Sequence, residues 1–215
     1  MSAKLVVMKQ ISLIALVFLL QQSNFAVAQK SVVEQLKITP NNSTPKVLTQ
    51  KDKKALQEEV LDTFFGRLHV EKDPAKALVL TRAIWRTWAK SGSDTADLLL
   101  QRSQKAMRAG KTYVSISILS LVVEQYPEFA EAWNKRATAY FILQNYQKSK
   151  EDIQEVLKLE PRHFGALAGL GMIYQAEGNE KKALQVFRRA LAINPHLKDV
   201  KQAIKLISGK IEKDI

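Results

Sequence analysis

The sequence contains no cysteine, so it has no disulfide bond, thiolate nucleophile or cysteine-bound metal. Histidine is also scarce: His69, His163 and His196 lie far apart, and none has neighbours with the spacing of a zinc site. His163 and His196 each follow a proline by one or two residues, where a side chain can cap the next helix. We therefore expect no metal site and no cofactor.

Long apolar runs are few, and the clearest one is too short to cross a bilayer. Ile11–Leu20 is about ten residues long, whereas a membrane-spanning helix needs roughly 20. A lysine-containing start precedes this run, and Ala26-Val27-Ala28 follows it as a small-x-small cleavage site. This arrangement predicts a signal peptide over residues 1–28, cleaved before Gln29, and a periplasmic or secreted protein. An uncleaved anchor is the alternative interpretation.

Acidic residues are outnumbered, which leaves a formal net charge of +12. The surplus is spread along the chain, and no arginine cluster alternates with aromatic residues as it does in proteins that bind single strands. We expect no nucleic-acid partner. Weak, salt-sensitive contact with an anionic membrane or envelope polymer is the interaction that such a charge favours.

Groups suited to catalysis are missing as well. Glu151, Asp152 and Glu155 bring carboxylates together, but Lys148 and Lys158 flank them at helical spacing, which favours a solvated ion-pair face. No serine lies in a nucleophile elbow with a suitable histidine. We predict no catalytic residues and no enzymatic activity.

A repeat dominates the second half of the chain. Pro127, Pro161 and Pro195 are spaced by 34 residues, and each ends an apolar helical segment. Each unit has two such segments with a polar or glycine break between them. A single helix pair cannot bury its apolar face alone, so stacked pairs are expected to share a continuous core.

The last unit carries the most complete motif, and with it the chain resembles the tetratricopeptide repeat family. The family pattern W-x2-L-G-x2-Y, A-x3-F and P is matched at all but its first position, where this chain has Leu167. Units of about 96–129, 130–163 and 164–197 within residues 94–196 predict an all-α, right-handed superhelical solenoid of antiparallel helix pairs. The matching residues of the last unit are Leu170, Gly171, Tyr174, Ala183, Phe187 and Pro195.

The flanking segments are predicted to frame the solenoid. Residues 29–50 are rich in proline, asparagine, serine and threonine and predict a flexible linker. Residues 51–93 predict a degenerate capping helix pair, which begins its second helix at an Asp73-Pro74 cap. Its Trp85 and Trp88 are interpreted as core residues, with a ligand-stacking platform as the alternative. Residues 197–215 predict a C-terminal capping helix and tail.

A closer resemblance extends over roughly residues 55–200. The segments Ala83–Trp88, Ser91–Leu100 and Pro161–Gly171 look like those of exported tetratricopeptide proteins of alphaproteobacteria. This resemblance implies a cell-envelope protein without an assigned catalytic activity.

The family resemblance also implies where a partner binds, because the first helix of each repeat lines a concave face. A subset of the family holds a terminal carboxylate there with lysines and asparagines. At the corresponding positions, which include Lys135, Gly165 and Gly169, this chain keeps one cation, so that specialised binding is not expected. We predict an exported adaptor or scaffold for a protein or peptide with apolar anchors, and electrostatic association with the envelope is the alternative function. The predicted groove residues are Leu100, Gln104, Met107, Asn134, Thr138, Phe141, Ala168, Met172 and Gln175.

Overall fold

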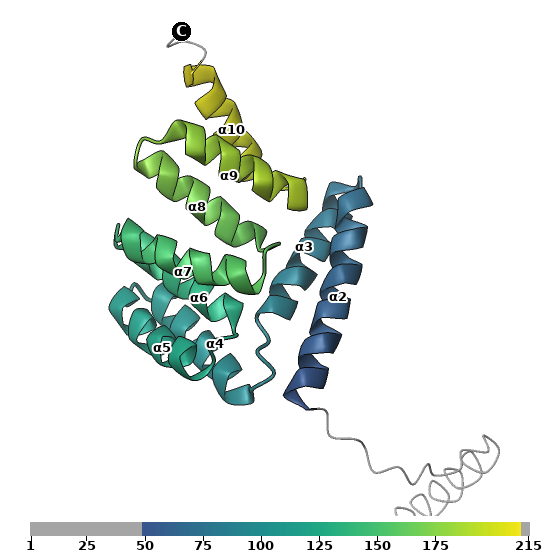
Figure 1. Ribbon diagram of the computed structural model, residues 1–215, viewed down its shortest axis with the longest axis vertical. Coiled ribbons are helices and arrows are strands. Elements are labelled where there is room, and N and C mark those ends of the chain that lie inside the picture. The colour runs from purple at the N-terminus through teal and green to yellow at the C-terminus, as the bar shows by residue number, and fades with distance from the viewer. Residues whose placement is uncertain (1–48, 212–215) are drawn as a thin grey trace, which may run out of the picture. The chain divides into compact units, whose positions relative to one another are not determined.

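The computed structural model describes residues 49–211, which lie within one compact unit of the chain (Figure 1). The predicted signal peptide over residues 1–28 and nearly all of the predicted linker over residues 29–50 fall outside the described residues, as do residues 212–215. The described part consists of helices and short loops, with no strand. The helices are α2 (Gln50–Val70), α3 (Pro74–Trp88), α4 (Asp94–Arg108), α5 (Thr112–Gln125), α6 (Ala130–Ile142), α7 (Tyr146–Leu159), α8 (Phe164–Ala176), α9 (Glu180–Ile193) and α10 (Lys198–Ile211).

Three antiparallel helix pairs, α4–α5, α6–α7 and α8–α9, stack into the predicted right-handed solenoid (Figure 1). The predicted fold class is confirmed. Buried side chains from both helices of each pair form the core, which continues from one pair to the next. After the third pair, α10 packs on α9 through Val200 and Ile207. None of the described helices is both long and apolar enough to cross a membrane.

The turn inside each helix pair requires a left-handed residue. Gly110, Gln144 and Gly178 are spaced by 34 residues and have φ values of 71°, 56° and 74°. Two turns therefore use glycine, which adopts this conformation without steric cost, and the middle turn uses glutamine, which does not. The residue that follows caps the second helix in two of the units, since the side chains of Asn145 and Asn179 accept from backbone amides.

We expect Gln144→Gly to raise the free energy of unfolding by about 0.5–1 kcal/mol, because it removes the left-handed strain and costs only some unfolded-state entropy. Urea denaturation measures this change, and the slope of the free energy of unfolding against urea concentration is expected to stay the same. The reciprocal change, Gly178→Gln, places a side chain at the same φ and is expected to lower stability by a similar amount. A stabilising effect of Gly178→Gln would contradict the strain at this turn.

The middle unit departs from the family motif at two positions, and the structure explains both. Arg136 replaces a leucine and forms a two-point ion pair with Asp152, with Nε–Oδ2 and Nη2–Oδ1 distances of 2.8 and 2.7 Å. Ser149 replaces an alanine, and its hydroxyl donates to the Ala137 carbonyl at 2.8 Å. Burial raises the pKa of Asp152 in spite of these bonds from Arg136. Asp152 therefore belongs to the contact between α6 and α7 and is not a member of a surface carboxylate group.

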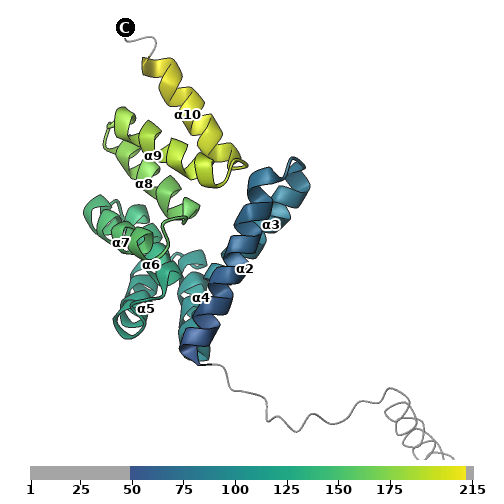
Figure 2. The same cartoon turned by 45° about the vertical axis from the view of Figure 1, so that its right-hand side comes forward.

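The predicted helix pair over residues 51–93 is present as α2 and α3, but its packing differs from that of a stacked repeat. Asp73 caps α3 and Pro74 is its first residue, as expected. However, the two helices lie side by side along the ends of the stacked pairs, and they pack closely against each other but only sparsely against other helices (Figures 1 and 2). Their side chains contact the loops between successive units, which a helix pair stacked on α4 like a further repeat would not reach.

Candidate functional site

The first helices of the three units, α4, α6 and α8, contact one another along the stack and share the face predicted to hold a partner. Of the nine predicted groove residues, three are exposed: Thr138, Met172 and Gln175. Four are partly buried: Gln104, Met107, Phe141 and Ala168. The remaining two are buried: Leu100 and Asn134.

The assignment of Leu100 and Asn134 to the groove surface is wrong. Leu100 is 1% exposed and packs in the core between α4 and α5 with Leu119. Asn134 is 6% exposed, and its side-chain amide donates to Glu131 Oε2 at 2.8 Å. Both residues occupy positions that the repeat spacing assigns to the groove, but their side chains are buried and make contacts inside the protein.

A cavity of about 270 Å3 opens between α4 and α6 at the C-terminal halves of these helices. Three predicted groove residues line it together with two cationic side chains, Arg108 and Lys135, and the lining includes no carboxylate. The buried Ser115 hydroxyl also lines it and has no hydrogen-bond partner among the described residues. We call the accessible residues of this end the open half of the groove: Gln104, Met107, Thr138, Phe141, Met172 and Gln175.

The other end of the same face, where α6 and α8 begin, is covered by α3. The Trp85 ring lies so close to Gly165 that a Cβ atom there would come within 2.3 Å of it. Trp88 stacks on the buried His163 ring, with centroids 4.0 Å apart and planes at 12°. Trp88 also packs against Phe164 with a centroid distance of 5.0 Å. The core interpretation of the two tryptophans holds, and their contact surface belongs to the third unit.

A buried polar cluster supports this covered end. Glu131 is 2% exposed and His163 is fully buried, with 3.2 Å between Oε2 and Nε2. His163 Nδ1 accepts from the Ala166 amide, so Nε2 carries the hydrogen and donates to Glu131. The Lys135 ammonium lies 2.8 Å from the other Glu131 oxygen and 5.0 Å from the Trp85 ring centroid. We call Glu131, Lys135, His163, Phe164 and Gly165 the rim.

The Glu131 carboxylate is charged at neutral pH even though it is buried. Burial alone raises the pKa of its carboxyl, but the hydrogen bond from His163 and the charge of Lys135 outweigh burial. The pKa of Glu131 therefore lies below its ordinary value of 4.5. The predicted capping role of His163 is confirmed, and the same ring holds this carboxylate in place.

Comparison with known proteins identifies the family. A TPR repeat-containing protein of Rhizobium etli is 34% identical to this chain over 165 residues, which cover 77% of this chain and 81% of the relative. The chain belongs to the tetratricopeptide repeat (TPR) family. A family model for the tetratricopeptide repeat matches residues 128–195. The relative comes from an alphaproteobacterium, in agreement with the group that the sequence resembles.

More distant similarities agree with the TPR fold. TPR repeat-containing protein YvcD of Bacillus subtilis is 28% identical over 106 residues, and the match spans 22% of that protein. The crystal structure of MamA protein has a TM-score of 0.52 at 20% identity and covers 76% of this chain and 86% of that chain. The first TPR of Spaghetti (RPAP3), bound to the HSP90 peptide SRMEEVD, has the same TM-score and identity and covers 54% and 93%.

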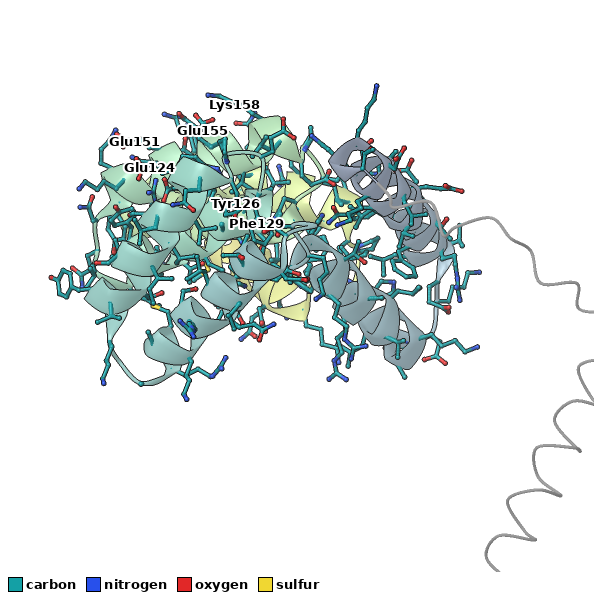
Figure 3. All side chains as sticks on the ribbon, turned by 90° about the horizontal axis from the view of Figure 1, so that it is seen from below. Glu124, Tyr126, Phe129, Glu151, Glu155 and Lys158 are labelled. Atoms are coloured by element: carbon teal, nitrogen blue, oxygen red, sulfur yellow. The ribbon has the colours of Figure 1, made fainter. Side chains whose placement is uncertain are left out.

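The outer surface of this TPR chain carries solvated charges. Figure 3 shows Glu151, Glu155 and Lys158 on the outside of α7, where Lys158 Nζ lies 2.6 Å from Glu155 Oε1. These contacts fit the predicted ion-pair face, with Asp152 turned inward instead. Within residues 49–211 no group of three or more metal-binding side chains is brought together.

Glu131 and the rim were not among the predicted site residues. Spacing along a repeat places Lys135 and Gly165 on the concave face of a TPR, but it does not show that another segment covers them. One signal in the sequence was available: Trp85 and Trp88 are three residues apart on α3, and Gly165 stands at a groove position where a side chain is usual. The two bulky indole rings of α3 and the absence of a side chain at Gly165 are complementary in shape.

Proposed function

We propose that this TPR protein is an exported adaptor that binds a protein or peptide partner on the open half of its groove, within the cell envelope. The proposal rests on one observation. Thr138, Met172 and Gln175 are exposed on the C-terminal halves of α6 and α8, and a cavity opens beside them between α4 and α6.

The chemistry of the open half favours an apolar anchor. Met107, Phe141 and Met172 supply apolar surface, and methionine side chains adapt to different shapes. Gln104, Thr138 and Gln175 can bond the polar backbone of an extended peptide or the side chains of a helix. A binding role accounts for this surface better than catalysis, since its side chains include no acid, base or nucleophile in a reactive arrangement.

The fold also supports peptide binding, because a TPR of RPAP3 with the same architecture holds an HSP90 peptide. We do not expect the acidic end of that peptide to be the ligand here. Lys135 is the cation of the groove at the positions compared above, and it is already paired with Glu131 and lies 5.0 Å from the centroid of the Trp85 ring. The partner proposed for this chain is therefore recognised by its apolar side chains.

The experiment is a crosslinking pull-down from the native periplasm with the mature protein and its Thr138→Glu plus Met172→Glu variant. Both residues are exposed, so the charges enter the groove without opening the core. The matched control, Tyr113→Glu plus Leu121→Glu, changes two exposed residues on α5, the second helix of its pair. We expect at least a tenfold loss of one captured protein with the groove variant and none with the control.

A salt series separates this function from the alternative of electrostatic association. Capture by an apolar groove is expected to persist from about 0.1 to 0.5 M salt, whereas contact with an anionic polymer or membrane weakens steeply over that range. If the groove variant captures the same proteins as the wild type, or if salt removes every captured component, the adaptor function on this face is wrong.

A further inference from the structure

The helix pair α2–α3, which we call the strap, contacts the loops before successive helix pairs at regular intervals. Loop residues Glu128, Arg162 and His196 are spaced by 34 residues, one in each loop. Along α2 and its C-cap, their partners are Lys54, Asp62 and the Glu71 carbonyl. The partners are eight and nine residues apart, or about 12–14 Å along a helix, so α2 runs parallel to the stack and meets one loop per step.

Two of these three contacts are weak, whereas the bond between His196 and the Glu71 carbonyl is partly buried, as is a bond from the Asn194 side-chain amide to the Thr81 hydroxyl of α3. The Lys54–Glu128 and Arg162–Asp62 ion pairs are exposed, and exposed ion pairs contribute little. The substantial contact is the one that α3 makes with the rim. There Trp85 and Trp88 surround the start of α8 with rings at 4.0–5.5 Å from those of His163 and Phe164.

The strap has a core that it shares at one end with the solenoid. Leu61, Leu68, Ala77, Leu80 and Ile84 are all buried in it, and the same cluster includes Phe164 of α8. The contacts between α2 and α3 themselves hold the two helices together as a hairpin, whereas Phe164 joins this core to the rim.

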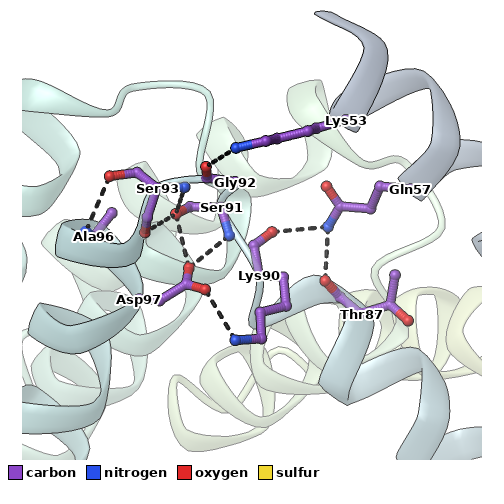
Figure 4. A network of polar contacts seen from close by, with 9 residues as sticks. All are labelled: Lys53, Gln57, Thr87, Lys90, Ser91, Gly92, Ser93, Ala96 and Asp97. Carbon is purple, nitrogen blue, oxygen red and sulfur yellow. Dashed lines mark hydrogen bonds and ion pairs between the residues drawn. The ribbon is translucent and has the colours of Figure 1, made fainter. Parts of the chain in front are cut away.

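The junction between the strap and the solenoid has a pivot. Lys53 donates to the Gly92 carbonyl and Gln57 donates to the Thr87 and Lys90 carbonyls, so this side of the junction is bonded to α2 (Figure 4). Asp97 of α4 bonds across Gly92 to the strap side of the junction: it accepts from the Ser91 amide and hydroxyl, and it lies 3.2 Å from Lys90 Nζ. A movement of the strap at Gly92 therefore also breaks these contacts. Gly92 has a φ of 82°, a conformation that glycine changes at low cost.

We propose that the rim is a docking site for an amphipathic helix with two aromatic side chains three residues apart, and that α3 of the same chain occupies it as an autoinhibitory contact. The strap leaves the rim as a unit by pivoting at Gly92, and the site then becomes available. This inference goes beyond the proposed function, because it concerns the rim and not the open half of the groove.

Hydrogen exchange of the full chain tests whether the strap opens as a unit. The variant is Gly165→Ala, whose Cβ would lie 2.3 Å from Trp85. The matched control is Gly169→Ala, on the same helix, whose Cβ would meet nothing nearer than Ile153 at 3.8 Å. We expect amides of α2 and α3 to exchange together at least about tenfold faster in Gly165→Ala, with α4–α9 unchanged and Gly169→Ala like the wild type.

Mixing two full-length variants tests whether the rim is a docking site. The Trp85→Ala plus Trp88→Ala variant is the acceptor: it keeps the rim residues but lacks the two rings that pack on them. The Gly165→Ala variant is the donor: it keeps both rings, but its own rim no longer accommodates them. The two variants are mixed at about 100 µM, because a contact with a millimolar effective concentration within one chain can then also form between chains. We expect native mass spectrometry to show a one-to-one complex of the two variants. Adding Gly165→Ala to the acceptor is expected to abolish it.

Two results would overturn the proposal. If α2 and α3 exchange only with the rest of the chain in both variants, the strap is a fixed part of the core. If Gly165→Ala releases the strap but no complex of the two variants forms, the rim is not a docking site. Both readouts use only this chain, so they are independent of whether the pull-down finds a partner for the open half.

Discussion

Glu131→Ala is expected to lower the free energy of unfolding by about 3–5 kcal/mol, the usual cost of removing one member of a buried charged network. The carboxylate is 2% exposed and accepts hydrogen bonds from both Asn134 and His163. Without it, two buried donors lose their acceptor, and Lys135 loses its counter-charge beneath Trp85. Chemical denaturation of both proteins measures the loss.

The matched control for this substitution is Glu155→Ala, which removes an exposed carboxylate paired with Lys158 and is expected to change stability by less than about 0.5 kcal/mol. Glu131→Gln supplies a second comparison, because it keeps an acceptor and removes the charge. A small effect of Glu131→Ala, similar to that of the control, would show that the rim does not depend on this carboxylate.

The difference between wild type and Glu131→Gln also depends on pH. The pKa of Glu131 is lower in the folded protein than its ordinary 4.5, so its charge stabilises the fold above that value. This contribution is lost as the pH falls through the folded-state pKa. We therefore expect the stability advantage of the wild type over Glu131→Gln to shrink from about pH 6 to about pH 3. Comparing the two proteins cancels the opposite effect of Asp152, whose pKa is raised.

The repeat was predictable from the sequence because its signals are local. A proline every 34 residues, a glycine at the turn and the Asp73-Pro74 cap each specify backbone geometry within a few residues of themselves. The stacking of helix pairs then follows from the apolar faces that each unit leaves uncovered. For this reason the solenoid and its helix pairs follow from the pattern alone.

The position of the strap was not predictable in the same way. Residues 51–93 have the amphipathic pattern of a further helix pair, and that pattern is compatible both with stacking on α4 and with lying along the loops. The choice depends on contacts between residues about 80 positions apart, such as that of Trp85 with Gly165. Periodicity reports which face of a helix is buried, but it does not identify the surface that covers this face.

The same reason explains the two groove residues that are buried. A repeat position fixes the direction of a side chain from its helix but not whether that side chain is accessible, as Leu100 and Asn134 show. The Asn134 amide bonds Glu131 on the same helix, and Glu131 is a buried member of the rim. The accessible site is therefore smaller than the predicted one and is confined to the end that the strap leaves uncovered.

Phe187→Ala is expected to lower the free energy of unfolding by about 3–5 kcal/mol, because it empties an aromatic site in the third TPR unit. Phe187 is 1% exposed and lies directly over Gly171. A Cβ at Gly171 would come within 2.4 Å of this ring, so Gly171→Ala is expected to destabilise the protein, although alanine normally favours a helix by about 1 kcal/mol over glycine.

The two substitutions are expected to compensate each other, since the new methyl group enters the space that Phe187 leaves. The double variant should lose at least about 1 kcal/mol less than the sum of the single losses in urea denaturation. Gly169→Ala serves as the control, because its nearest neighbour is at 3.8 Å, and it is expected to be neutral or stabilising. Strict additivity of Gly171→Ala and Phe187→Ala would mean that the glycine is required for a reason other than the approach of this ring, and the physical explanation of the family motif in this chain would have to be sought in the backbone of α8.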